Sequence, residues 1–167
     1  GLFEFGAEEM GSEFVRRVWW GVVTSDIMED IRSMILANAV DPEASLEIYN
    51  REWNLIIAAL ERGDFSLLEK QCAGSAAKLA RIPMKLRPKE VPIISLIGEI
   101  FVRRDALSRQ YITERLAEKG FATICSPIAE WILYTDYLVD KGFVDSRMSK
   151  RERLEFLLKK KFMHRYE

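Results

Sequence analysis

The chain has 167 residues, of which 49% are hydrophobic and 31% are charged, and its 25 basic and 26 acidic residues leave a net charge of −1. A chain of this length can bury about 70% of its unfolded surface, so it does not need disulfides to be stable. Without a basic excess to displace counterions from phosphates, nucleic acid is not expected as a partner. No run approaches about 18 uninterrupted apolar residues, so no membrane span is expected either.

The two cysteines, Cys72 and Cys125, lie far apart and belong to no CxxC pair. This usage predicts reduced thiols in a cytoplasmic protein, without a zinc or redox motif of its own. The chain begins with Gly1 and carries no cleavable signal pattern, which predicts a piece of a longer protein.

Residues 1–82 are predicted to form a helical subdomain. Ser12 is a good N-cap for a first helix, and apolar residues follow it at helical spacing as far as Ile35. Gly21 and residues 24–26 could bend this helix. The simplest function of its apolar stripe is core packing.

Two further helices are predicted before residue 82. Asp41-Pro42 supplies a cap and a first-turn proline for the second helix, and Gly63 ends it. Residues 66–69, Ser-Leu-Leu-Glu, match a capping box for the third. That helix is expected to present four residues on one apolar side, where a free cysteine behaves as a small hydrophobe: Leu68, Cys72, Ala76 and Leu79.

Residues 83–90 contain prolines with basic residues between them and predict a linker between subdomains. Beyond it, residues 91–97 form a short apolar run that predicts a strand buried on both faces, as in a parallel sheet. Gly98 would then allow a sharp turn at the end of the strand.

An alternation of strands and helices is predicted for residues 91–167. An amphipathic segment at residues 107–119 indicates a helix, residues 121–125 a second strand, and Ser126-Pro127 the start of another helix. The order β-α-β-α with short connections implies parallel strands. The chain is therefore predicted to be α/β, with a helical N-terminal part packed on a small Rossmann-like unit.

Several residues near the C-terminus are interpreted as structural. A capping box at residues 149–152 predicts a last helix starting at Arg151, and residues 159–161, Lys-Lys-Lys, are typical of a solvated last turn. The lone histidine, His164, has no neighbouring ligand. One aromatic set on the preceding helix is interpreted as packing rather than as a stacking platform: Trp131, Tyr134 and Tyr137.

Ligands of open α/β sheets bind beyond the carboxyl ends of the strands, which selects two segments as candidate binding residues. After the first strand, Glu99 could act as a base or accept a hydrogen bond, and Arg103 could clamp a phosphate or carboxylate. Glu99 could equally be a buried structural partner of a backbone amide or an arginine. After the second strand come Cys125 and Ser126.

The sequence contains neither GxGxxG nor GxxxxGK[ST], so the standard nucleotide-phosphate loops are missing. With a single histidine, the sequence offers few residues from which a Ser/His/Asp or Cys/His catalytic constellation could form. No cluster of acidic residues and histidine has metal-ligand spacing. These observations indicate that the chain holds no self-contained active site.

Residues 92–138 resemble the 2-hydroxyacyl-CoA dehydratase family, and most closely its large members described as CoA-substrate-specific enzyme activase or dehydratase D-component related. The resemblance is carried by Ile-Gly-Glu-Ile-Phe-Val-Arg at residues 97–103, Leu-Ala-Glu-Lys-Gly at 116–120, Ser-Pro-Ile-Ala-Glu-Trp-Ile at 126–132 and Tyr-Thr-Asp-Tyr at 134–137. Residues 19–30 and 80–83 fit as well, so that it covers roughly residues 12–165.

The resemblance implies that the parent protein takes part in removing water from 2-hydroxyacyl-CoA thioesters by one-electron reduction. Such dehydratases hold 4Fe–4S clusters on cysteines and receive the electron from an ATP-hydrolysing activator with an actin-like fold. The activator's phosphate motifs and a full cysteine set are both missing here, so no cofactor is expected in this chain alone. Cys125 is the better placed of the two cysteines for a cluster.

Three functions follow from these expectations. The first is a lobe that contributes part of a cleft for an iron–sulfur cluster or an acyl-CoA, with the rest of the parent chain as its partner and no activity alone. The second is a ligand-free assembly module, which includes a homo-oligomer. The third is a small-molecule enzyme in its own right with Glu99 as its main catalytic candidate; whether the chain is an enzyme stays open.

Overall fold

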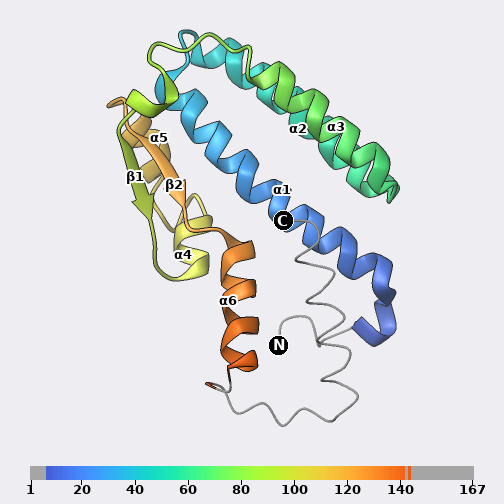
Figure 1. Ribbon diagram of the computed structural model, residues 1–167. Coiled ribbons are helices and arrows are strands. Elements are labelled where there is room, and N and C mark those ends of the chain that lie inside the picture. The colour runs from blue at the N-terminus through green and yellow to red at the C-terminus, as the bar shows by residue number, and fades with distance from the viewer. Residues whose placement is uncertain (1–6, 142, 144–167) are drawn as a thin grey trace. The chain divides into compact units, whose positions relative to one another are not determined.

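The structure is a computed structural model, and it describes residues 7–141 and residue 143. These residues belong to two compact units, Gly1–Pro127 and Ile128–Glu167 (Figure 1). Each unit is described by itself. The chain is mostly helical and contains a small parallel sheet, so the predicted α/β class is confirmed at that level.

Helix α1, Ala7–Asn38, is the central element of the first unit, and a kink at Gly11 divides it so that its long part follows Gly11, next to the predicted start at Ser12. Only Gly11 leaves the helical region inside it, with φ 74° and ψ 164°. Gly21 and residues 24–26, where a bend was considered, keep helical angles. The Thr24 hydroxyl donates to the Trp20 carbonyl at 2.5 Å, a bond made within the helix itself.

Helices α2, Pro42–Arg62, and α3, Phe65–Leu79, form a hairpin against α1 (Figure 1). The predicted boundaries of α2 are confirmed: the Asp41 side chain accepts the Ala44 N–H at 3.1 Å, and Gly63 ends the helix with φ 74°. The predicted capping box of α3 at residues 66–69 is wrong. Asp64 is the cap and accepts the Leu67 N–H at 3.0 Å, because an aspartate two residues earlier competes successfully with Ser66.

The main core lies between these three helices and includes Ile35, Ile56 and Leu68. On α3 the expected stripe holds for Leu68 and Leu79, whereas Ala76 is exposed and Cys72 is half-buried. Ser75 occupies the buried position in their place. Its hydroxyl donates to the buried carboxylate of Glu52 at 3.0 Å, so this helix face contains a polar contact that apolar periodicity does not show.

Strands β1, Ile93–Leu96, and β2, Ala122–Cys125, pair in parallel, with Ile93 opposite Ala122 and Leu96 opposite Cys125. Helix α1 lies between α2 and the sheet, and it packs against β2 with the side that faces away from α2 (Figure 1). The prediction that the first strand is buried on both faces is wrong: Ile93 and Ser95 are exposed, and Ile97 just after the strand is 80% exposed. The reason is that the described part of the chain covers only one face of β1.

The connection between the strands differs from the single helix predicted at residues 107–119. It contains α4, Ile100–Arg104, and α5, Ile112–Ala117, separated by turns in which Gln110 and Tyr111 both have φ 53°. The side chain of Arg109, in the segment between the two helices, makes tertiary bonds. Its Nη1 donates to Glu29 on α1 at 2.7 Å and to the Arg103 carbonyl at 3.1 Å.

The predicted linker at residues 83–90 is tied to the end of α1. The Val40 N–H donates to the Pro83 carbonyl at 2.9 Å, the Lys85 N–H donates to the Asn38 carbonyl at 2.8 Å, and a short 3₁₀ helix, η1, follows at Pro88–Glu90. The helices α1, α2 and α3 and both strands fall within one compact unit, Gly1–Pro127. The division of the chain into residues 1–82 and 91–167 stays a prediction.

The described part of the second unit is helix α6, Ile128–Asp140, with the residues just after it. Among its aromatic residues, which were interpreted as packing, Trp131, Tyr134 and Tyr137 are exposed in the described part of the structure. The helix predicted from Arg151, the lysines at 159–161 and His164 lie outside the described residues. Among the helices that the structure describes, none is long and apolar enough to cross a membrane.

Candidate functional site

The two predicted segments meet at one edge of the sheet. Because β1 and β2 are parallel, both strands deliver their following residues to the same side, and the Ser126 N–H donates to the Leu96 carbonyl at 3.0 Å (Figure 1). Gly98-Glu99 and Cys125-Ser126 therefore follow the same end of the sheet. Gly98 has φ 125°, a conformation that side chains rarely adopt, so glycine is needed at this turn.

Glu99 is committed to the backbone that follows it. Its Oε2 accepts the N–H groups of Phe101 at 2.8 Å and Val102 at 3.0 Å, which makes it the N-cap of α4. Of the alternatives considered for Glu99, the partner of a backbone amide is the one observed, on an exposed rather than a buried side chain. The arrangement fixes the loop after β1 through one oxygen of this carboxylate.

Cys125 is buried at the end of β2, and its thiol donates to the Arg103 carbonyl at 3.5 Å. Burial raises the pKa of Cys125 above its usual value, so the protonated thiol is favoured. The pKa of Cys72 is raised for the same reason. In the part of the chain that the structure describes, no group of three His, Cys, Asp or Glu side chains is arranged to hold a metal.

The predicted clamp residue, Arg103, closes the loop after β1 by donating from Nη1 to the Gly98 carbonyl at 3.2 Å. Its neighbour Arg104 makes the connection that the sequence analysis missed. Arg104 Nη2 donates to the Ser126 carbonyl at 3.1 Å, so the loop after β1 is linked to the end of β2.

A network of ion pairs joins this edge to α1. Arg104 pairs with Asp26 at 2.5 Å and with Glu29 at 2.7 Å, and Arg109 pairs with the second oxygen of Glu29 at 2.7 Å. Asp26 is only 8% exposed, so these charges are removed from water together. The sequence contained a signal for this network, because three acids recur at helical spacing on one face of α1: Asp26, Glu29 and Asp30.

Asp30 accepts the backbone N–H of Cys125, and burial raises the pKa of its carboxyl group. The nearest favourable charge, that of Arg104, acts in the opposite direction and is outweighed. A carboxyl group with a raised pKa is therefore in contact with the end of β2, next to the predicted binding residues.

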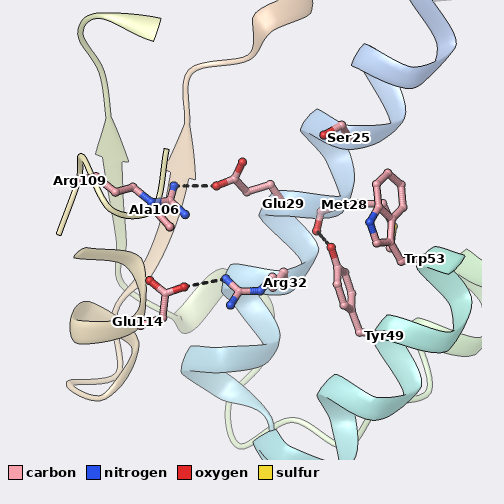
Figure 2. Close-up of a pocket in the computed structure, with 9 residues that line it drawn as sticks. All are labelled: Ser25, Met28, Glu29, Arg32, Tyr49, Trp53, Ala106, Arg109 and Glu114. Atoms are coloured by element: carbon pink, nitrogen blue, oxygen red, sulfur yellow. Dashed lines mark hydrogen bonds and ion pairs between the residues drawn. The ribbon is translucent and has the colours of Figure 1, made fainter. Parts of the chain in front are cut away.

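A pocket of about 290 Å³ adjoins the ion-pair network (Figure 2). Glu29 and Arg109 belong to both. Figure 2 shows Arg109 and Glu114 reaching toward α1 from one side and the aromatic residues on α2 on the other. The lining comes from three segments distant in sequence: Ser25, Met28, Glu29, Arg32, Tyr49, Trp53, Ala106, Arg109 and Glu114.

The charges of the pocket are paired across it. Arg32 Nη1 donates to Glu114 at 3.0 Å, and although burial acts against it, the backbone N–H of Glu114 and the Arg32 guanidinium lower the pKa of the Glu114 carboxyl. The Tyr49 hydroxyl donates to the Met28 carbonyl at 3.0 Å, and burial raises the pKa of Tyr49 to about 12. This phenol stays protonated at neutral pH.

Arg32 is the residue of this pocket best able to take up a ligand. Its side chain is 34% exposed and spends one N–H on Glu114, and the guanidinium group carries five N–H donors. Next to the aromatic rings of Tyr49 and Trp53, it can bind an acyl or carboxylate group. No family model, curated protein or solved structure matches the chain.

Proposed function

We propose that the chain is a Rossmann-like lobe with a helical flank, belonging to a protein related to the 2-hydroxyacyl-CoA dehydratases and their large activases. In this proposal it contributes one wall of a cleft and is inactive without the rest of a longer cytoplasmic protein. The observation that carries the proposal is the parallel pairing of β1 with β2. It brings together residues 98–103 and 125–126, which belong to the segments that resemble the family.

An acyl-CoA thioester fits this edge better than an iron–sulfur cluster. A cluster requires thiolate ligands, whereas Cys125 is buried, donates its proton to a carbonyl and has a raised pKa. The adjoining pocket offers aromatic surface and the spare donors of Arg32 instead. Its volume of about 290 Å³ suits an acyl group rather than a whole coenzyme.

Binding of a thioester is measured by isothermal titration of the chain with a 2-hydroxyacyl-CoA, with free CoA as the comparison. Arg32→Ala removes the spare donors of the pocket and is expected to weaken binding about tenfold, since a hydrogen bond from a charged donor contributes about 1.5 kcal/mol or more. Arg115→Ala, on the exposed side of α5, is the matched control. A wild-type chain that binds neither compound contradicts the thioester proposal.

The cluster alternative is tested by anaerobic reconstitution with iron and sulfide, followed by visible absorption. The two cysteines form a matched pair, because Cys125 lies at the proposed edge and Cys72 lies on α3. A cluster that forms in the wild type and in Cys72→Ser but is lost in Cys125→Ser would favour a cluster site over a thioester site.

A ligand-free assembly module is the second candidate, favoured by large apolar side chains that remain exposed near β1. Phe101 is 76% exposed, and Ile97, Val102 and Leu107 are exposed as well. Surfaces of this kind often mark sites of association. Sedimentation of the chain tests this candidate. A strict monomer at high concentration would contradict it, because the exposed apolar surface would then not mediate association.

A further inference from the structure

The two outer edges of the sheet differ in what covers them. Along the outer edge of β2, the Thr123 N–H donates to the Ser33 hydroxyl at 2.6 Å, and the Cys125 N–H is bound by the Asp30 carboxylate. Side chains of α1 thus take the place that a third strand would occupy. Covering an edge with a helix is one of the ways in which proteins prevent further strand pairing. The sheet cannot be extended on this side.

The outer edge of β1 has no such cover among the residues that the structure describes. The carbonyls of Pro92 and Leu96 accept N–H groups from β2, so the period of two directs the backbone groups of Ile93 and Ser95 away from β2. No described strand other than β2 pairs with β1. Within the part of the chain that the structure describes, this edge therefore presents unpaired donors and acceptors in the spacing of a strand.

The side chains along this edge lack the features that prevent pairing. Natural edge strands carry lysine, proline or an inward-pointing charge. Residues 93–97, Ile-Ile-Ser-Leu-Ile, contain none of these, and Ile93 and Ile97 are 47% and 80% exposed. Parallel strands are normally covered on both faces, so this exposure is itself unusual.

The pattern of the edge is self-complementary. In an antiparallel pairing of two identical strands about Ser95, Ile93 of one strand lies opposite Ile97 of the other, and serine lies opposite serine. Every cross-strand pair on the exposed face is then apolar or uncharged, and no like charges meet. A two-fold axis at Ser95 satisfies both copies equally, as an isologous interface requires.

We propose that β1 is a dimerisation edge and that its occupant is β1 of a second copy of this chain, paired antiparallel about Ser95 into a continuous four-stranded sheet. This is strand addition in which both partners supply the same strand. The proposal does not depend on thioester binding. Loss of the dimer and loss of the ligand would be seen by different measurements.

The test is sedimentation equilibrium of the full chain up to about 100 µM, a concentration that detects dimers with micromolar dissociation constants. Ser95→Pro removes an outward N–H and leaves the ladder to β2 in place, because proline is tolerated on edge strands. Ser95→Ala keeps the N–H and is the matched control. We expect the wild type and Ser95→Ala to be dimers and Ser95→Pro to dissociate at least tenfold more readily.

A second variant keeps the proposal testable if the Ser95→Pro chain does not fold. Ile97→Lys replaces the apolar pair with Ile93 of the other copy by a charged residue of the kind that natural edge strands carry against pairing, while altering a side chain that makes little contact within the chain. Amide exchange adds a local measurement: the Ser95 amide should be protected in the wild-type dimer and exchange freely in Ile97→Lys, whereas the Leu96 amide, which faces β2, stays protected in both. A monomeric wild type, or a dimer unaffected by either variant, overturns the proposal.

Discussion

Two regions of the molecule are stabilised by different forces. One is the hairpin of α2 and α3 with α1, and the other is the region where β1 and β2 end. The hairpin is held by a contiguous apolar core, with helix ends set by local caps such as Asp41 and Gly63. The strand ends are held to α1 by ion pairs between residues 75 or more positions apart in sequence. The first region should therefore respond mainly to changes of side-chain volume and the second to changes of charge.

The comparison also separates structural roles from binding roles. Glu99 and Cys125, which were candidates for chemistry, are both engaged with backbone groups. The residues with spare capacity, Arg32 above all, lie in the pocket beside the network. Charges that appear reactive in the sequence can be structural, and the ligand contacts can come from residues nearby that no motif marks.

The largest effect is expected in the core of the hairpin. Leu68→Ala removes a side chain that is almost completely buried and should lower the free energy of unfolding by about 3 to 4 kcal/mol through lost burial and the cavity left behind. Urea denaturation measures the change. Leu107→Ala, at an exposed position, is the control and should stay within about 0.5 kcal/mol. Equal losses in the two variants would argue against a core between α1, α2 and α3.

The next effect is expected in the ion-pair network. Arg104→Met keeps much of the side-chain volume but removes the guanidinium from Asp26 and Glu29, which should cost about 2 to 3 kcal/mol because buried carboxylates lose a partner. The same change at Arg87, whose pair with Glu90 is exposed, should cost clearly less, because solvent screens the charges of an exposed pair. A network that contributes no more than this exposed pair would show similar denaturation midpoints for the two variants.

A smaller loss is expected where α1 covers β2. Ser33→Ala removes the acceptor of the Thr123 N–H and the 2.9 Å contact between the two hydroxyls, and should cost about 1 to 2 kcal/mol for the buried amide left unpaired. The Thr123 amide should also exchange faster with deuterium. Ser95→Ala serves as the exposed control. Unchanged exchange at Thr123 would show that Ser33 does not protect this edge.

The smallest effect is a pH dependence within the hairpin. Hydrogen bonding from Lys78 lowers the pKa of the buried Glu52 carboxyl below 4.5, so its contribution is complete above pH 4.5 and is lost as the pH falls through the lowered value. Glu52→Gln should cost about 1 kcal/mol at pH 7, because its partner is half-exposed. The difference from wild type should shrink on acidification below pH 4.5; a constant difference would mean that the charge of Glu52 contributes little.

The sequence was sufficient wherever a signal was local. Asp41-Pro42 and Gly63 bounded α2 correctly, because caps and stop signals act over three or four residues. The same rule identified the wrong cap for α3, since Asp64 and Ser66 both satisfied it and only the folded chain shows which one bonds Leu67. The parallel pairing of the two strands also followed from the order of elements.

The amino-acid sequence by itself determined the helical hairpin, the two strands and their parallel pairing, because periodicity, caps and strand order are properties of neighbouring residues. The tertiary structure alone decided that a helix predicted at residues 107–119 is interrupted, that Arg104 connects the strand ends to α1, and that α1 covers one edge of the sheet while no described element covers the other. Each of these depends on charges or backbone groups brought together across many tens of residues, and the energy of such contacts is decided by burial, which only the fold defines.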